Sequence, residues 1–178
     1  MYSNKNSKIK KKKNIFIKIK TKRILIEKLK KEDINQNYVN RLNDKHLMKY
    51  SQHKNKKHTL KSSIEYFSKL DLSDNLYLAI KDIKTKKIIG TMTVYFKKKF
   101  SFADIGILIS SKIHHGKGYG NEAWINLMSF LNKKMMVKNI TGGCFLNNIK
   151  MINIFKNSGM SFTHKNLKKQ VFYIKKFR

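Results

Sequence analysis

The chain has 178 residues, enough for one domain with a proper hydrophobic core and too many for a small scaffold that depends on disulfides. Hydrophobic residues make up 40% and aromatic residues 11%, so burial of apolar surface can outweigh the conformational entropy lost on folding. Global disorder is therefore excluded. Lysine and arginine total 41 against 10 acidic residues, which gives a formal net charge of +31.

A charge of this size is typical of proteins that bind polyanions. Dedicated nucleic-acid-binding proteins also concentrate arginine, but this chain has only Arg23, Arg41 and Arg178. Proline is absent and lysine is spread evenly along the chain, so we interpret the charge mainly as a compositional bias. We expect no specific nucleic-acid partner; a non-enzymatic nucleic-acid-binding module, with binding that weakens steeply with salt, is the third hypothesis for function.

Cys144 is the only cysteine, which excludes an internal disulfide and a zinc site built from cysteines. No metal site is expected. Lysine interrupts every apolar run before the roughly 18 residues of a membrane span. The segment IFIKIK carries charges inside its apolar stretch, unlike a secretory signal. We therefore expect a cytoplasmic protein without a membrane partner.

The first 22 residues are mostly lysine and polar residues. We expect a flexible basic tail at 1–22, with a loose edge strand as the alternative because isoleucine alternates near its end. The remainder, 23–178, is expected to be a single domain. It begins with a strand over 23–29, followed by an amphipathic helix that Asp33 would cap. Asn43 and Asp44 would end that helix.

The later elements follow from hydrophobic periodicity and turn residues. Residues 51–59 are polar and loop-like, and Thr59 is positioned to cap a second helix. The remaining expected elements are strands at 76–80, 88–96 and 102–109, a helix from Gly120, a strand at 137–145, a helix at 148–158 and two strands from Met160. This order predicts a mixed α/β fold in which one sheet carries helices on its faces.

Three glycines lie within HGKGYG, residues 115–120, between an apolar strand and an amphipathic helix. Glycines let the backbone turn tightly and present N–H groups to an anion, and a helix N-terminus adds roughly half a positive charge. Lys117 adds a full charge. The spacing fits no Walker loop, and Asn121 stands where the dinucleotide fingerprint requires glycine. We interpret the segment as a phosphate-binding loop of another kind.

This loop resembles that of the GNAT superfamily of acyl-CoA-dependent N-acyltransferases, and the resemblance extends over roughly 23–172. The family signature, Arg/Gln-x-x-Gly-x-Gly/Ala, falls on His115 to Gly120. The strings HHGKGYGNEAW and NNIKMINIFKNSGMSF are similar to the branch with ribosomal-protein N-terminal acetyltransferases and sugar N-acetyltransferases. The chain departs from the pattern at His115 in place of Arg or Gln, at Met151 in place of Ser, and at Phe155 in place of a Tyr.

The resemblance implies a twisted, mostly antiparallel central sheet with helices on both faces, and acetyl-CoA as the acyl donor. The loop amides would bind the diphosphate, Asn148 would hold the pantetheine arm, and an N–H near the end of ADIGILIS would polarise the thioester carbonyl. The residues expected to contact the coenzyme are Leu108, Ile109, Ser110, His115, Gly116, Lys117, Gly118, Tyr119, Gly120, Asn121, Asn148 and Phe155.

Acetyl transfer needs a neutral amine and a proton for the departing thiolate. Asp104 is the candidate general base, with an ordinary solvated strand residue as the alternative. Phe155 donates no proton, so another group or water would protonate the thiolate, or it leaves unaided, since its reference pKa is about 8.5. Glu122 suits a structural role in the first helical turn. His53, His58 and His114 are interpreted as surface histidines.

Two classes of amine acceptor stay open. The first is a small molecule, foremost a nucleotide-linked amino sugar, whose phosphates the lysines of HKNKKHT would bind. The second is the N-terminal amine of a ribosomal or other protein, as in the branch that the chain resembles. A polyamine is disfavoured because like charge repels it, even with screening over about 8 Å. Either a monomer or a homodimer is compatible with the sequence.

Overall fold

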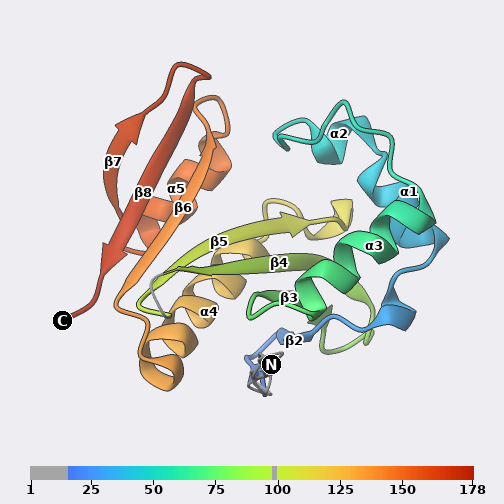
Figure 1. Cartoon of the computed structure of the whole chain (residues 1–178), viewed down its shortest axis with the longest axis horizontal. Coiled ribbons are helices and arrows are strands. Elements are labelled where there is room, and N and C mark those ends of the chain that lie inside the picture. The colour runs from blue at the N-terminus through green and yellow to red at the C-terminus, as the bar shows by residue number, and fades with distance from the viewer. Residues whose placement is uncertain (1–15, 98–99) are drawn as a thin grey trace, which may run out of the picture.

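The computed structural model describes residues 16–97 and 100–178. It contains one eight-stranded sheet in the order β1-β2-β3-β4-β5-β6-β8-β7, in which only the β5–β6 pair is parallel (Figure 1). The strands are β1 (Lys18–Lys20), β2 (Ile24–Lys28), β3 (Leu76–Asp82), β4 (Ile88–Lys97), β5 (Phe102–Ile109), β6 (Asn139–Phe145), β7 (Ser161–Lys165) and β8 (Gln170–Lys176). The helices are α1 (Gln36–Leu42), α2 (Lys45–Met48), α3 (Leu60–Asp71), α4 (Tyr119–Met135) and α5 (Ile149–Asn157).

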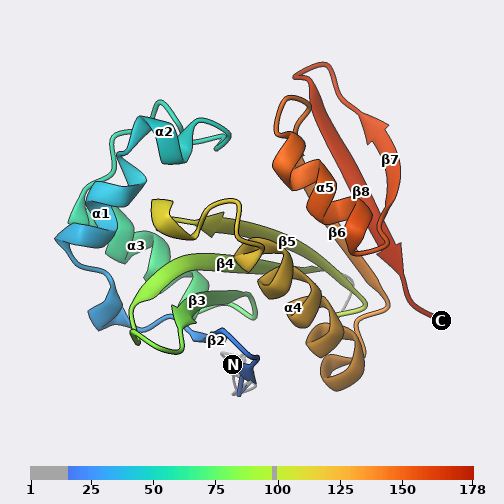
Figure 2. The same cartoon turned by 180° about the vertical axis from the view of Figure 1, so that it is seen from behind.

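Helices cover both faces of the sheet, which confirms the expected fold class. Figure 1 shows α3 in front of β3 and β4, and Figure 2 shows α4 on the opposite face. The larger core lies under α4 and α5 and includes the fully buried Trp124 and Phe155. A smaller core lies under α1 and α3 and includes Tyr38 and Ala79.

Alternation along each strand divides its side chains between these two cores. On β3, Leu78 and Ile80 are fully buried in the α4 core, whereas Ala79 between them packs under α1 and α3. On β5, Ala103 and Ile105 belong to the α4 core. Asp104 therefore lies on the α3 face of the sheet.

The capping prediction is confirmed for α3 and wrong for α1. Thr59 Oγ1 accepts from Ser62 N at 3.1 Å, and Ser62 Oγ accepts from Thr59 N at 3.0 Å, so α3 begins with a capping box. Asn35, not Asp33, caps α1 by accepting from Tyr38 N. Asp33 instead accepts from Lys30 N in a short 3₁₀ turn that precedes the helix.

Part of the predicted tail belongs to the sheet. Lys18–Lys20 form an edge strand paired with β2, and the side chain of Ile17 is 3% exposed. The alternating isoleucines therefore mark a strand, because Ile17 gains burial against the core. The prediction of a flexible basic tail over residues 1–15 lies outside the described residues.

Candidate active site

The site begins where β5 and β6 part. The two strands pair only at Phe102↔Asn139, Ala103↔Ile140 and Asp104↔Thr141, although β6 pairs along its whole length with β8. Beyond these pairs β6 turns away together with β8, as Figures 1 and 2 show. The second half of β5 therefore has β4 as its only strand neighbour in the described chain.

Backbone direction decides which groups of β5 face this opening. Ala103 O accepts from Thr141 Oγ1 on β6 at 3.4 Å. Because alternate residues of a strand point their backbone groups to the same side, Ile107 and Ile109 also direct theirs to the side that β6 leaves. Leu108 and Ser110 face β4, and Ser110 N donates to Ile89 O at 2.8 Å. Of the three strand residues expected to contact the coenzyme, Ile109 alone offers its backbone to the opening.

His115 ties the glycine loop to this strand end. Its Nε2 lies 2.7 Å from the carbonyl oxygen of Ile109. The imidazole ring thus connects the glycine loop to the end of β5, where the pantetheine arm would lie. The sequence placed His115 in the loop, and the structure adds that its side chain bonds to β5.

The glycine loop leaves the start of α4 open to an anion. Gly116 and Gly118 have φ values of 73° and 81°, a region that residues with a side chain rarely adopt. Gly118 immediately precedes α4 and has no side chain to cap it, so the helix begins without a side-chain partner for its first N–H groups. In the same turn the buried Oδ1 of Asn121 has no hydrogen-bond partner among the described residues. The uncapped N–H groups fit a diphosphate, whereas the Asn121 oxygen is an acceptor and fits only a donor such as an amide N–H.

Glu122 lies in the first turn of α4 beside this loop. It accepts from Thr21 Oγ1 at 2.5 Å and from Arg23 Nε at 2.7 Å. Burial alone would raise the pKa of the Glu122 carboxyl, but these donors and the charge of Arg23 outweigh it and lower that pKa. The contacts agree with a structural role for Glu122, and the motif alone did not indicate its partner Arg23.

Asn148 immediately precedes α5, and Phe155 belongs to that helix. Asn148 caps the helix, since its Oδ1 accepts from Met151 N at 3.3 Å. Phe155 is fully buried between the rings of Trp124 and Tyr173, with centroids 5.4 Å and 4.9 Å away. A Cβ on Gly142 would lie 2.9 Å from the Phe155 ring, so Phe155 packs directly against the backbone of β6. Contact of Asn148 and Phe155 with the coenzyme stays a prediction.

Asp104 lies at the last paired position before β5 and β6 separate. Its Oδ2 accepts from Thr141 Oγ1 at 2.7 Å. Burial raises the pKa of the Asp104 carboxyl, and the Thr141 bond and the charge of Lys97 only partly oppose this effect. A carboxylate with a raised pKa at the apex of the opening is suited to accept a proton from an amine.

A chain of four tyrosines that the sequence did not reveal begins beside Asp104, at Tyr95 on β4. Tyr95 is the register partner of Asp104 on β4, and its hydroxyl lies 2.5 Å from that of Tyr66 on α3. The Tyr66 ring packs edge-on against Tyr77, whose hydroxyl bonds to that of Tyr38. Helical and strand spacing alone does not show that α3 lies across β4, so these phenols could not be connected from the sequence.

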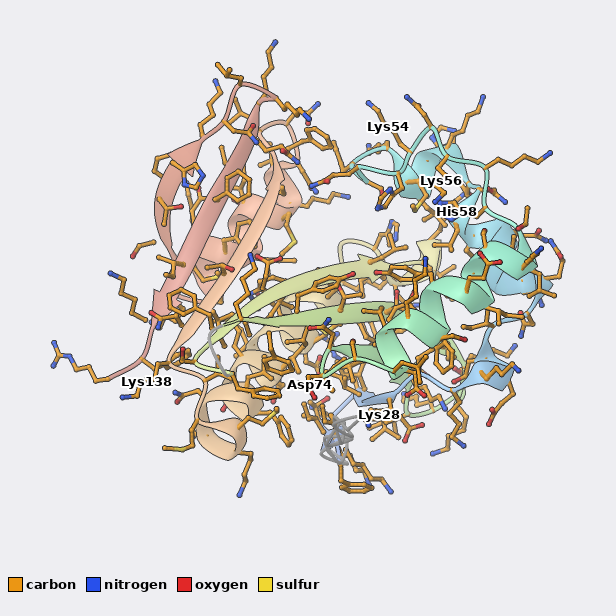
Figure 3. All side chains as sticks on the ribbon, in the orientation of Figure 1. Lys28, Lys54, Lys56, His58, Asp74 and Lys138 are labelled. Carbon is orange, nitrogen blue, oxygen red and sulfur yellow. The ribbon has the colours of Figure 1, made fainter. Side chains whose placement is uncertain are left out.

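The polar segment 51–59 lies near the outer end of β6. Asn43 anchors it, because its side chain accepts from His58 N and donates to His58 O, both at 2.8 Å. The Nζ of Lys54 lies 5.9 Å from the centroid of Phe145 on β6, and Figure 3 shows Lys54, Lys56 and His58 along this segment. Burial first, then Lys56 and His53, lower the pKa of His58. The segment thus brings positive charge to the end of the opening.

The remaining histidine of the loop region has structural partners. His114 Nδ1 lies 2.7 Å from Ser111 Oγ, and its ring packs edge-on against Tyr119. Its Nε2 lies 3.8 Å from Asp82. The prediction of a surface histidine is wrong for His114, because these contacts leave its side chain only 12% exposed.

Residues 23–161 match the sequence profile of the family described as "Acetyltransferase (GNAT) domain". The chain belongs to the GNAT acetyltransferase family. Its GNAT domain is an N-acetyltransferase that uses acetyl-CoA, and the open loop and the parted strands suit that coenzyme. No protein of curated function matches the sequence.

Solved structures agree with the GNAT fold. An acetyltransferase of the GNAT family from Bacillus anthracis is 19% identical with a TM-score of 0.75, and the match covers 90% of this chain and 98% of that one. Ribosomal-protein-S5-alanine acetyltransferase from Vibrio fischeri is 18% identical with a TM-score of 0.73, covering 90% and 96%. Spermidine N-acetyltransferase from Vibrio cholerae is 16% identical with a TM-score of 0.72, covering 85% and 92%.

Within residues 16–97 and 100–178, no helix is both long and apolar enough to cross a bilayer. In the same residues, no three His, Cys, Asp or Glu side chains lie together as a metal would require.

Proposed function

We propose that this GNAT domain acetylates the primary amine of a small acceptor that also carries anionic groups, foremost a nucleotide-linked amino sugar. The observation that carries the proposal is the placement of Asp104 at the apex of the opening, with the lysines of segment 51–59 near its outer end. The acceptor would then place its amine near Asp104 and its phosphates near Lys54 and Lys56.

The backbone would hold the donor. Amides of residues 116–121 would face the diphosphate, and the backbone of Ile107 and the N–H of Ile109 would pair with the pantetheine amides as an added strand does, since His115 already bonds to the Ile109 carbonyl. An N–H fixed on β5 stabilises negative charge that develops on the thioester oxygen, because it needs no reorientation during attack. Acetyl-CoA supplies the activated thioester and a thiolate whose reference pKa is about 8.5.

Asp104 would make the amine nucleophilic. Only the neutral amine attacks, and a carboxylate held in place by Thr141 accepts its proton directly or through one water. The fully buried Phe155 has no proton to give, so another group or water protonates the thiolate, or it leaves unaided. Positioning of the two substrates along β5 supplies much of the rate.

The test is a turnover assay with acetyl-CoA and a panel of nucleotide-linked amino sugars, in which released thiol is measured. The proposal expects turnover on at least one of them, and Lys54→Ala should raise KM for that acceptor with KM for acetyl-CoA unchanged. Lys61→Ala, an exposed lysine on α3, is the matched control. Absence of turnover on every phosphate-bearing amine would refute this acceptor class.

A protein N-terminus is the second candidate acceptor. It is favoured by the structural likeness to the ribosomal-protein-S5-alanine acetyltransferase of Vibrio fischeri over 90% of this chain. Peptides with free and with blocked N-terminal amines distinguish the candidates in the same assay. Turnover on free peptide N-termini, with none on the amino sugars, would replace the first acceptor by the second.

A further inference from the structure

Arg23, in the turn just before β2, connects that turn to the glycine loop. Its Nε donates to Glu122 Oε2 at 2.7 Å, and its Nη2 lies 2.6 Å from the same oxygen. Its Nη1 donates to the carbonyl oxygen of Lys117 at 2.8 Å. One guanidinium therefore holds both the first turn of α4 and the loop that precedes it.

The Lys117 contact sets the direction of a loop amide. In a trans peptide the C=O and the following N–H point in opposite directions. Because Arg23 draws the Lys117 carbonyl toward itself, the N–H of Gly118 is directed away from Arg23. A Cβ on Gly118 would lie 3.4 Å from Arg23 Nη2, so the guanidinium packs directly on this turn.

The Glu122 contact removes a charge conflict. An acidic side chain in the first turn of a helix interacts favourably with the helix dipole, but here it lies beside the site proposed for a diphosphate. The Glu122 side chain is 16% exposed, so solvent screens its charge incompletely. Pairing with Arg23 leaves the two side chains together neutral.

Ring contacts fix the guanidinium in this place. Its central carbon lies 4.3 Å from the centroid of Tyr119, the first residue of α4, and the edge of His114 supports the same ring. Thr21 Oγ1 donates to the second oxygen of Glu122 at 2.5 Å. The arrangement is fixed by contacts from the turn between β1 and β2, the glycine loop and α4 together.

We propose that Arg23 is a positioning residue for the coenzyme diphosphate, acting through Glu122 and the Lys117 carbonyl. It cancels the carboxylate charge beside the diphosphate and turns the Gly118 N–H toward it. The inference rests on the proposed placement of the coenzyme at the loop. It assigns to the turn between β1 and β2 a part of the coenzyme site that lies outside the glycine motif.

The test combines Arg23→Gln, Glu122→Gln and the double variant, with the dissociation constant of CoA measured by calorimetry and with steady-state kinetics. Arg23→Gln leaves Glu122 without its ion-pair partner. We therefore expect the dissociation constant of CoA and KM for acetyl-CoA to rise about 5- to 30-fold, with kcat nearly unchanged. The double variant removes the repulsion and should recover much of that loss. Glu122→Gln alone should weaken binding far less than Arg23→Gln.

The dependence of CoA affinity on ionic strength gives a second readout, which a purely steric defect would not change. The defect of Arg23→Gln should shrink as ionic strength rises, because salt screens the repulsion between Glu122 and the phosphates. Arg23→Lys, which keeps the charge with fewer donors, should bind CoA with an intermediate affinity and serves if Arg23→Gln does not fold.

Lys81→Gln is the matched control. It also removes one positive charge and breaks a 2.7 Å ion pair, with Glu27, in which both side chains are partly buried. This pair makes no ion pair or hydrogen bond with residues 115–121 in the described chain. Lys81→Gln should bind CoA as the wild type does.

The results separate this inference from the proposed function. Equal CoA affinity of Arg23→Gln and Lys81→Gln, or a double variant that binds no better than Arg23→Gln, would overturn the role of Arg23 while leaving the coenzyme site in place. A wild-type chain that binds no CoA would refute the coenzyme placement, and the inference with it.

Discussion

The hydroxyl of Thr141 on β6 donates a 2.7 Å hydrogen bond to Oδ2 of Asp104 on β5, at the last residue pair before the two strands separate. The bond therefore marks the apex of the opening in which the thioester would lie. It also orients one carboxylate oxygen and leaves the other for the amine. The candidate base and the point where the strands separate therefore lie at the same residue pair, Asp104 and Thr141.

The pH profile of the enzyme should report Asp104. Burial raises the pKa of the Asp104 carboxyl above its usual value of 3.8. As pH falls through this raised pKa, the carboxylate is protonated and kcat/KM should decrease. Thr141→Val removes a donor to the ionised form and should move this acid limb to higher pH. Asp104→Asn should lower kcat by about 10²- to 10⁴-fold.

These three measurements use the same acetyl-transfer assay over a range of pH. Thr141→Ser keeps the hydroxyl and is the control for Thr141→Val. An acid limb at the same pH in wild type and Thr141→Val would assign that limb to another group. Wild-type activity in Asp104→Asn would leave Asp104 a structural residue.

The contribution of Asp104 to stability should decrease as pH rises, whereas its contribution to activity should increase. A folded-state pKa above the unfolded value means that the folded chain binds this proton more tightly. The contribution of Asp104 to the free energy of unfolding is therefore most favourable below the unfolded pKa and is lost as pH rises through the folded one. At neutral pH Asp104→Asn should be no less stable than wild type in urea unfolding, and a clear loss of stability would contradict this.

Alanine at the two left-handed glycines should weaken coenzyme binding to different degrees. At Gly116 a Cβ meets nothing within 4 Å, so the change adds only backbone strain of about 1–2 kcal/mol. At Gly118 the same strain adds to a contact with Arg23. KM for acetyl-CoA should therefore rise in both variants and more in Gly118→Ala; the reverse order would count against the contact with Arg23.

Gly142→Ala should destabilise the fold rather than the coenzyme loop. The new Cβ would lie 2.9 Å from the Phe155 ring and 3.0 Å from the Trp124 ring, both fully buried. Overpacking of this kind costs about 1–3 kcal/mol, measurable by chemical unfolding. Gly143→Ala meets the partly exposed Phe172 ring instead and should cost less. Equal stability of Gly142→Ala and wild type would show that β6 can shift away from α4.

Local chemistry made much of the fold predictable. Thr59 and the glycines of the loop act on their own neighbours in sequence, and the alternation of Ala103 and Ile105 shows which face of β5 is buried. Asp33 misled because a second capping residue, Asn35, follows two positions later and begins a better helix. The choice between such neighbours depends on how Tyr38 and Val39 reach the core.

The parts of the site that the sequence did not show depend on long-range packing. Arg23 and Glu122 are 99 residues apart, and Tyr66 and Tyr95 meet only because α3 crosses β4. The parting of β5 from β6 is likewise a property of the sheet, since both strands continue in sequence beyond Asp104 and Thr141. None of these three relations leaves a spacing pattern within one segment.

Backbone amide spectra of the protein titrated with CoA give the most direct test of the coenzyme site. We predict saturable shifts for the N–H groups of Gly116 and Gly118 in the loop and of Ile107 and Ile109 on β5. Leu108, whose backbone faces β4, should shift less. Saturable shifts confined to other parts of the chain, or no shifts at all, would contradict the placement of the coenzyme between the glycine loop and the parted strands.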